Sequence, residues 1–105
     1  MIYTVDEIKK RVKPVADKYH LRAVYLFGSY ARREATDSSD VDLLIDRTDS
    51  TIRGMFDMGS LYEDLKKSVG KSIDLITTQT LEQPDVLIRS AQLVSSIHKE
   101  RIRLI

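Results

Sequence analysis

The sequence predicts a small α/β fold in which helices cover a small β-sheet. Short apolar runs rich in β-forming residues alternate along the chain with segments whose apolar residues recur at helical spacing. The chain has 105 residues, 42% of them hydrophobic, which is enough for one modest core. We therefore expect a single domain over residues 1–105.

A first helix is expected after Thr4, because Thr4 and Glu7 have the spacing of a capping box. Pro14 lies inside this helix and should bend it or remove one of its hydrogen bonds. The apolar residues of the helix recur at helical spacing and are Val5, Ile8, Val12, Val15 and Tyr19.

Two strands should follow, over residues 22–27 and 40–46. A short helix is expected over 29–34 and a polar loop over 35–39. The second strand alternates, so one face should carry Val41, Leu43 and Ile45, and the other Asp40, Asp42, Leu44 and Asp46.

The second half of the chain predicts a middle helix, a third strand over 73–77, a final helix from Pro84 to about Lys99, and a short edge strand over 101–105. Gly70 should end the middle helix. The middle helix is indicated by Ile52, Met55, Phe56, Tyr62, Leu65 and Val69, and the final helix by a stripe of Leu87, Ala91, Val94 and His98.

The most informative motif is Gly28-Ser29, followed ten residues later by Asp40-Val41-Asp42. A glycine at the end of a strand lets the backbone approach a phosphate closely, and a serine adds a hydroxyl. Two carboxylates at i and i+2 of a strand point the same way and can share a divalent metal ion. Alone, Gly28-Ser29 would be an ordinary strand-to-helix turn, but the two halves together predict a magnesium–nucleotide site.

With these residues, the chain resembles the minimal nucleotidyltransferases of the DNA polymerase β superfamily. The similarity covers nearly the whole chain and includes Asp74, at the position of the family's third carboxylate. Family members commonly have glycine where this chain has Arg33, which puts the loop geometry in question. The resemblance implies a mixed sheet and a polymerase-β-like fold.

The resemblance also implies an activity: Mg²⁺-dependent transfer of AMP from ATP to a hydroxyl of a HEPN-type toxin, with this chain acting as the antitoxin. Asp40, Asp42 and Asp74 would be catalytic and would bind the metal, as two ions. Asp74 would also accept the proton of the attacking hydroxyl.

The remaining candidate residues would bind the nucleotide. The Gly28 backbone and the Ser29 hydroxyl would hold the distal phosphates, and the guanidinium groups of Arg32 and Arg33 suit phosphate oxygens. Ser39 would orient Asp40 or the nucleotide, although a plain loop role is an equal alternative.

Composition limits the kinds of ligand and partner that the chain is expected to have. The formal net charge is +1, which gives no support for nucleic-acid binding, and there are no cysteines for disulfides or thiolate zinc sites. No apolar segment approaches the length of a membrane span, so we expect no membrane association and a cytoplasmic location.

Two other functions compete with the enzyme. The chain could be a non-catalytic binding module that masks a HEPN ribonuclease by forming a complex, or a sensor that binds nucleotide without turnover. A masking protein would lose nothing on Asp42→Asn, whereas an enzyme would lose its function and keep its contacts. A homo- or hetero-oligomer is compatible with each of these functions.

Overall fold

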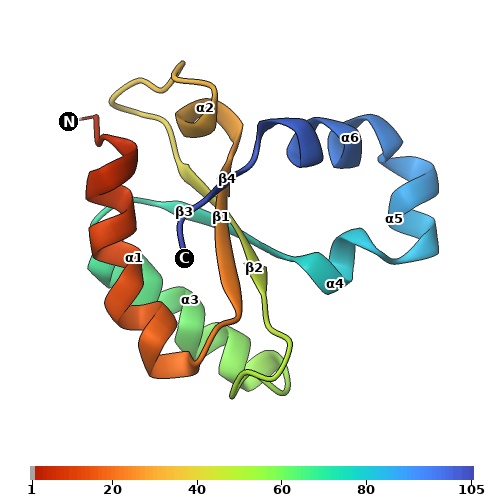
Figure 1. Cartoon of the computed structure of the whole chain (residues 1–105), viewed down its shortest axis with the longest axis horizontal. Helices are drawn as coiled ribbons and strands as arrows, with labels where there is room; N and C mark the ends of the chain where they lie inside the picture. The colour runs from red at the N-terminus through yellow and green to blue at the C-terminus, as the bar shows by residue number, and fades with distance from the viewer. Residues whose placement is uncertain (1) are drawn as a thin grey trace.

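The computed structural model describes residues 2–105 and places a four-stranded sheet between two groups of helices (Figure 1). In chain order the elements are α1 (Val5–Tyr19), β1 (Ala23–Phe27), α2 (Gly28–Ala31), β2 (Val41–Asp46), α3 (Met55–Val69), β3 (Ile73–Thr77), α4 (Thr78–Leu81), α5 (Pro84–Arg89), α6 (Ala91–Glu100) and β4 (Ile102–Arg103).

The sheet has the strand order β3-β2-β1-β4 and is mixed, as expected. β1 pairs antiparallel with both β2 and β4, whereas β2 pairs parallel with β3. The edge strand predicted over 101–105 is therefore present, although only Ile102 and Arg103 form it.

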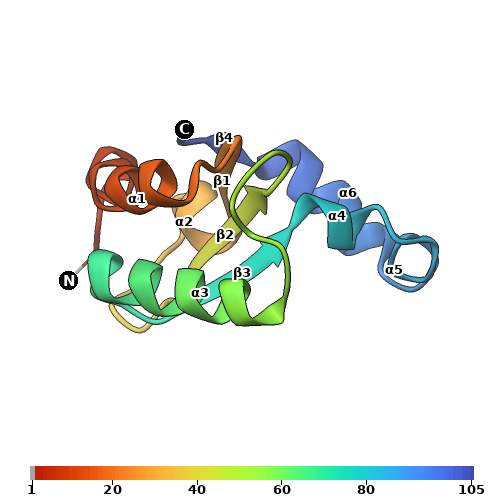
Figure 2. The same ribbon diagram turned by 90° about the horizontal axis from the view of Figure 1, so that it is seen from below.

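α1 and α3 lie side by side over one face of the sheet (Figures 1 and 2). The predicted apolar face of β2 packs beneath them, and Val41, Leu43 and Ile45 are fully buried. α1 begins as predicted, because the Thr4 hydroxyl accepts a hydrogen bond from the Glu7 amide at 3.2 Å. Pro14 is accommodated within the helix.

The other face of the sheet is covered only in part. A smaller apolar cluster joins this face to α4 and α6, and it consists of Phe27, Leu44, Leu81, Val94 and Ile97. The two faces of β2 thus lie in different environments. Leu44 enters this cluster, while Asp42 lies near the end of the same face, beyond it.

The predicted final helix is wrong as a single element. The chain forms α5 and α6 with a break at Ser90, whose φ of −125° and ψ of 32° are not helical. Of the predicted stripe, Val94 alone is buried; Leu87, Ala91 and His98 are exposed, and Ile97 takes the second core position. The physical reason is that α5 contains no fully buried residue and meets the smaller apolar cluster only through the partly buried Val86, so little core contact holds it in line with α6.

Other differences are small. α2 ends at Ala31 instead of continuing to residue 34, and α4 was not predicted. Ile52 precedes α3 but is buried all the same. Within residues 2–105, no helix combines the length and the apolar character that crossing a membrane requires.

Candidate active site

Two carboxylates of the candidate site are direct neighbours in the sheet. The parallel pairing of β2 with β3 sets Asp42 opposite Asp74, and adjacent strands lie about 4.8 Å apart. Phe27, the last residue of β1, lies opposite Asp42 on its other side. The end of β1 and the beginnings of β2 and β3 therefore meet at one end of the sheet.

Asp40 lies just before β2, two residues from Asp42, and is exposed, as is Asp74. Burial, together with the negative charges of Asp74 and Asp40, raises the pKa of Asp42 to about 6. The positive charge of Arg32 acts in the opposite direction. The three predicted carboxylates are thus close enough to repel one another, and a bound cation would relieve that repulsion.

Gly28 makes the turn from β1 into α2 against this carboxylate group. Its φ is +72°, in the left-handed region that glycine adopts at little cost. A Cβ added at this position would overlap the Asp42 side chain, beginning at Oδ2. Glycine is therefore required here for two separate reasons, the left-handed backbone and the close approach of the Asp42 carboxylate.

Ser29 is half-buried, and its hydroxyl makes no hydrogen bond to any residue that the structure describes. The Ser29 carbonyl accepts from the Glu34 amide at 2.8 Å, which closes the loop after α2. Arg33 lies in this loop with φ +60°. A glycine would adopt this backbone at little cost, so Arg33 keeps the loop geometry at a cost in strain.

Arg32 is held by two glutamates. Its Nε lies 3.2 Å from Glu34 and its Nη1 lies 3.0 Å from Glu100 at the end of α6. Glu100 was missed by the sequence reasoning, since it lies 68 residues away and nothing in the local pattern marks it. This ion pair connects α2, beside the carboxylates, to the helices on the same face of the sheet.

Ser39 has the loop role that was left open for it. Its hydroxyl accepts from the Thr36 amide at 2.8 Å, and its own amide donates to the Thr36 carbonyl at 3.0 Å. A contact between Ser39 and a nucleotide stays a prediction.

The donor set fits a hard divalent cation such as Mg²⁺, because carboxylate oxygens are its usual protein ligands. Within residues 2–105, however, no group of three acidic or histidine side chains is arranged so that it could hold a metal ion without rearrangement. The pair Asp42 and Asp74, held in register by the sheet, is the preformed part. Asp40 lies outside this register, one residue before β2 begins.

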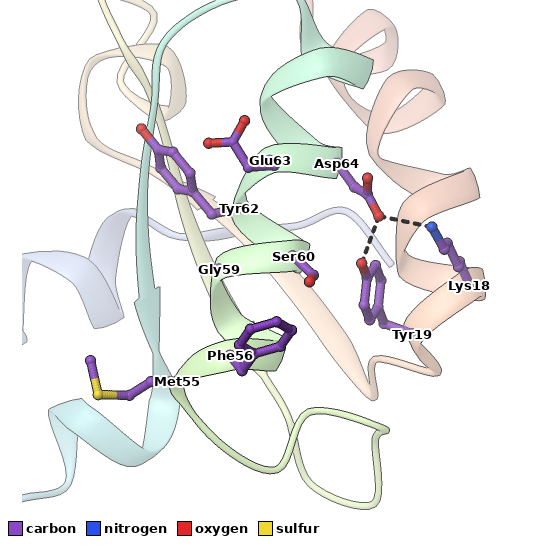
Figure 3. A pocket seen from close by; sticks show the side chains of 9 residues that line it. All are labelled: Lys18, Tyr19, Met55, Phe56, Gly59, Ser60, Tyr62, Glu63 and Asp64. Atoms are coloured by element: carbon purple, nitrogen blue, oxygen red, sulfur yellow. Dashed lines mark hydrogen bonds and ion pairs between the residues drawn. The ribbon is translucent and has the colours of Figure 1, made fainter.

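A large open groove of the described chain lies elsewhere (Figure 3). It is a groove of about 740 Å³ along α1 and α3, on the helices that cover the opposite face of the sheet. Within it Asp64 accepts hydrogen bonds from the Tyr19 hydroxyl at 2.6 Å and from Lys18 Nζ at 2.9 Å (Figure 3). This groove carries none of the predicted site residues.

Comparison with known proteins gives a family. The family model described as polymerase beta, nucleotidyltransferase matches residues 10–99. A protein of Methanocaldococcus jannaschii, named provisionally as a protein adenylyltransferase, is 37% identical over 87 residues, which cover 79% of this chain and 87% of that protein.

Solved structures share the fold. A protein provisionally identified as a minimal nucleotidyltransferase has a TM-score of 0.69 and 25% identity, and covers 95% of both chains. A complex of a tri-AMPylated HEPN toxin of Shewanella oneidensis with an MNT antitoxin gives a TM-score of 0.62 at 15% identity, over 97% of this chain and 72% of the matched chain. At that identity the second likeness shows the fold alone.

Proposed function

Because the chain belongs to the polymerase β nucleotidyltransferase family, we propose that it transfers AMP from ATP to a hydroxyl group of a HEPN-type partner protein. The observation that carries the proposal is the pair Asp42 and Asp74, set in register beside the Gly28 turn. Carboxylates next to an open, glycine-lined turn suit a metal-bound triphosphate.

The turn after β1 would hold the distal phosphates. The Ser29 hydroxyl is available to donate a hydrogen bond, since no described residue occupies it. The missing side chain of Gly28 lets the Asp42 carboxylate lie directly against the backbone of this turn, so a metal ion held by Asp42 would be close to phosphates bound there. Arg32 would contribute positive charge at this position while Glu34 and Glu100 keep its guanidinium in place.

The carboxylates Asp40, Asp42 and Asp74 would hold Mg²⁺, as two ions. When bound, magnesium would neutralise phosphate charge and orient the reacting oxygens. Asp74 is exposed, so an acceptor hydroxyl can reach it and give up its proton there. The acceptor oxygen forms a bond to the α-phosphorus, the bond from that phosphorus to the bridging oxygen breaks, and pyrophosphate leaves.

The acceptor is proposed from the relatives. The Methanocaldococcus jannaschii relative is named for adenylyl transfer to protein, and the Shewanella oneidensis complex contains a HEPN toxin carrying AMP. In the described chain, the exposed Asp74 leaves the reacting end of the sheet open to a macromolecular acceptor. Modification of the toxin would make this chain its antitoxin.

The test is intact-mass spectrometry of the partner that co-purifies with this chain, after incubation with ATP and Mg²⁺. We expect a mass gain of one or more AMP units with the wild type and none with Asp42→Asn. The matched control is Asp46→Asn, on the same face of β2, because Asp46 accepts from the Thr48 amide at 3.0 Å and lies outside the carboxylate group.

The Asp46→Asn variant should modify the partner as the wild type does. A partner that binds wild type and Asp42→Asn equally and is never modified would contradict the proposal and favour a masking antitoxin. Modification that survives Asp42→Asn would contradict the assignment of the site.

A further inference from the structure

One arginine beside the candidate site is bound to acids outside the site. The positive charge of Arg32 acts to lower the pKa of Asp42, against the effect of burial, so the two side chains lie near each other. The guanidinium nevertheless bonds elsewhere, with Nε 3.2 Å from Glu34 and Nη1 3.0 Å from Glu100. Among the described residues, none of the three candidate carboxylates forms an ion pair. The site thus keeps its negative charge uncompensated although a cation is close by.

The apolar cluster on this face of the sheet fixes the position of Glu100. Glu100 is the last residue of α6 and follows the buried Ile97 by three residues, so the two side chains share one side of the helix. Ile97 belongs to the same cluster as Phe27 of β1 and Leu44 of β2. The end of α6 also lies beside α2 (Figure 1). The Glu100 carboxylate is therefore tied to the two strands that carry the candidate site, and its side chain is only 27% exposed.

The two glutamates leave part of the guanidinium available. Arginine carries more N–H donors than the bonds to Glu34 and Glu100 use, and Nη2 of Arg32 bonds to no described residue. A guanidinium edge with free N–H groups can donate to two phosphate oxygens at once. Held in this way, Arg32 can bind a triphosphate without first leaving another partner.

We propose that Glu100 is a positioning residue, which together with Glu34 holds Arg32 away from the carboxylates that would bind the metal. The inference rests on the proposed function and deepens it. Without Glu100, the guanidinium would turn toward the uncompensated negative charge near it, which is the carboxylate group around Asp42. It would then compete with a divalent cation for the same oxygens. The ion pair is partly exposed and adds little to stability, so metal affinity is the quantity that reveals its role.

The test is the affinity of the full chain for Mn²⁺ alone, without nucleotide, measured by electron paramagnetic resonance of the free ion. Mn²⁺ takes the same oxygen ligands as Mg²⁺. We expect Glu100→Gln to lower this affinity about threefold to fivefold, the upper range for a partly exposed ion pair, and Asp42→Asn to remove the binding. Glu82→Gln is the matched control, because it removes one exposed carboxylate at the end of α4 that has no ion pair among the described residues. Its affinity should equal that of the wild type.

A double-variant cycle shows whether Glu100 acts through Arg32. Arg32→Gln removes the competing cation, so it should bind Mn²⁺ at least as tightly as the wild type. Adding Glu100→Gln to it should change nothing further, because the two residues act as one unit. In the partner-modification assay, Glu100→Gln alone should raise the Mg²⁺ concentration that gives half the maximal rate. The rate at saturating Mg²⁺ and ATP should stay close to that of the wild type.

The outcomes separate this proposal from the proposed function. Equal Mn²⁺ affinity in the wild type and Glu100→Gln, or the same loss with Arg32 already replaced, would overturn the positioning role and leave the AMP transfer standing. A wild type that shows the expected Mn²⁺ cycle but never modifies its partner would overturn the transfer and support the positioning role. A wild type that binds no Mn²⁺ would overturn both.

Discussion

At the scale of single residues, the backbone of Arg33 has a conformation that glycine adopts more easily than arginine. A left-handed φ of +60° costs a residue with a Cβ roughly 1–2 kcal/mol. The loop keeps this geometry because the Ser29 carbonyl and the Glu34 amide close it from both sides. A basic side chain next to Arg32 is thus retained in a position where glycine would be unstrained.

Arg33→Gly should be more stable than Arg33→Ala by roughly 1 kcal/mol, because both variants lose the charge and only glycine relieves the strain. Urea denaturation of the two variants measures the difference. Equal midpoints would show that the loop relaxes around a Cβ, and that the left-handed backbone is not a constraint.

The raised pKa of Asp42 makes stability depend on pH in a defined window. Between the ordinary value of 3.8 and about 6, the folded chain holds a proton on Asp42 that the unfolded chain has lost. The contribution of Asp42 to the free energy of unfolding therefore falls as pH rises from about 4 to about 6. Because solvent screens this partly exposed group, we expect a loss of about 1 kcal/mol.

The measurement compares wild type with Asp42→Asn by denaturation in the absence of metal and nucleotide. The free energy of unfolding of the variant should rise relative to that of the wild type across this window, since the asparagine side chain does not titrate. A difference that is flat with pH would mean that Asp42 ionises at its ordinary pKa and is not crowded by Asp74 and Asp40.

At the scale of elements, one polar cluster joins α1 to α3. The Tyr19 hydroxyl donates to Asp64 at 2.6 Å, and this bond, with burial, raises the pKa of Tyr19 to about 12. Tyr19→Phe should lower the free energy of unfolding at neutral pH by about 1 kcal/mol, as loss of a hydrogen bond to a carboxylate at a half-exposed site would.

Tyr62→Phe is the control in the same groove, because the Tyr62 hydroxyl makes no hydrogen bond to the described residues. Its stability should be within a few tenths of a kcal/mol of the wild type. Equal losses in the two variants would show that general packing of the tyrosine hydroxyls, and not the bond to Asp64, matters.

The elements also show where sequence reasoning succeeds and where it fails. β2 and β3 were predicted closely, because short apolar runs interrupted by carboxylates at every second position are typical of strands that pack on a core. The final helix failed because its apolar spacing at Leu87 and Ala91 is helical although no core lies beneath it. Periodicity reports a helix well, but it does not report what the helix packs against.

The same limit applies to the candidate site. Gly28 and Asp42 were predicted from a local motif and Asp74 from the family resemblance, and the structure brings them to one end of the sheet. The pairing of Arg32 with Glu100 joins residues 68 positions apart, so it depends on how α6 packs over the sheet. Their partnership is a property of the packing and could not be predicted from either segment alone.

At the scale of the whole molecule, stability is unevenly distributed. α1 and α3 share the main core, whereas α5 lies at the far end of the molecule from α1 and contains no fully buried side chain (Figures 1 and 2). Ile88 in α5 is 81% exposed. This segment is held by its neighbours in the chain more than by the core.

Amide hydrogen exchange should therefore be much faster in α5 than in α1 or α3, because opening α5 exposes little buried surface beyond that of Val86. Exchange followed by mass spectrometry of peptides measures this directly. Protection in α5 equal to that in α3 would indicate that something covers Ile88 in solution. Repeating the measurement after dilution would show whether such cover comes from another copy of the chain.

The register of β3 against β2 fixes more than the position of one side chain. Sliding β3 by a single residue would turn Asp74 into the apolar core and bring Ile73 or Leu75 to the solvent side. A change of register therefore cannot adjust the distance between the two carboxylates gradually. It either keeps the pair Asp42 and Asp74 or removes it. Insertions between Gly70 and Ile73 must therefore be accommodated as loop. The length of that loop can vary among related chains only as long as the register between β2 and β3 is unchanged.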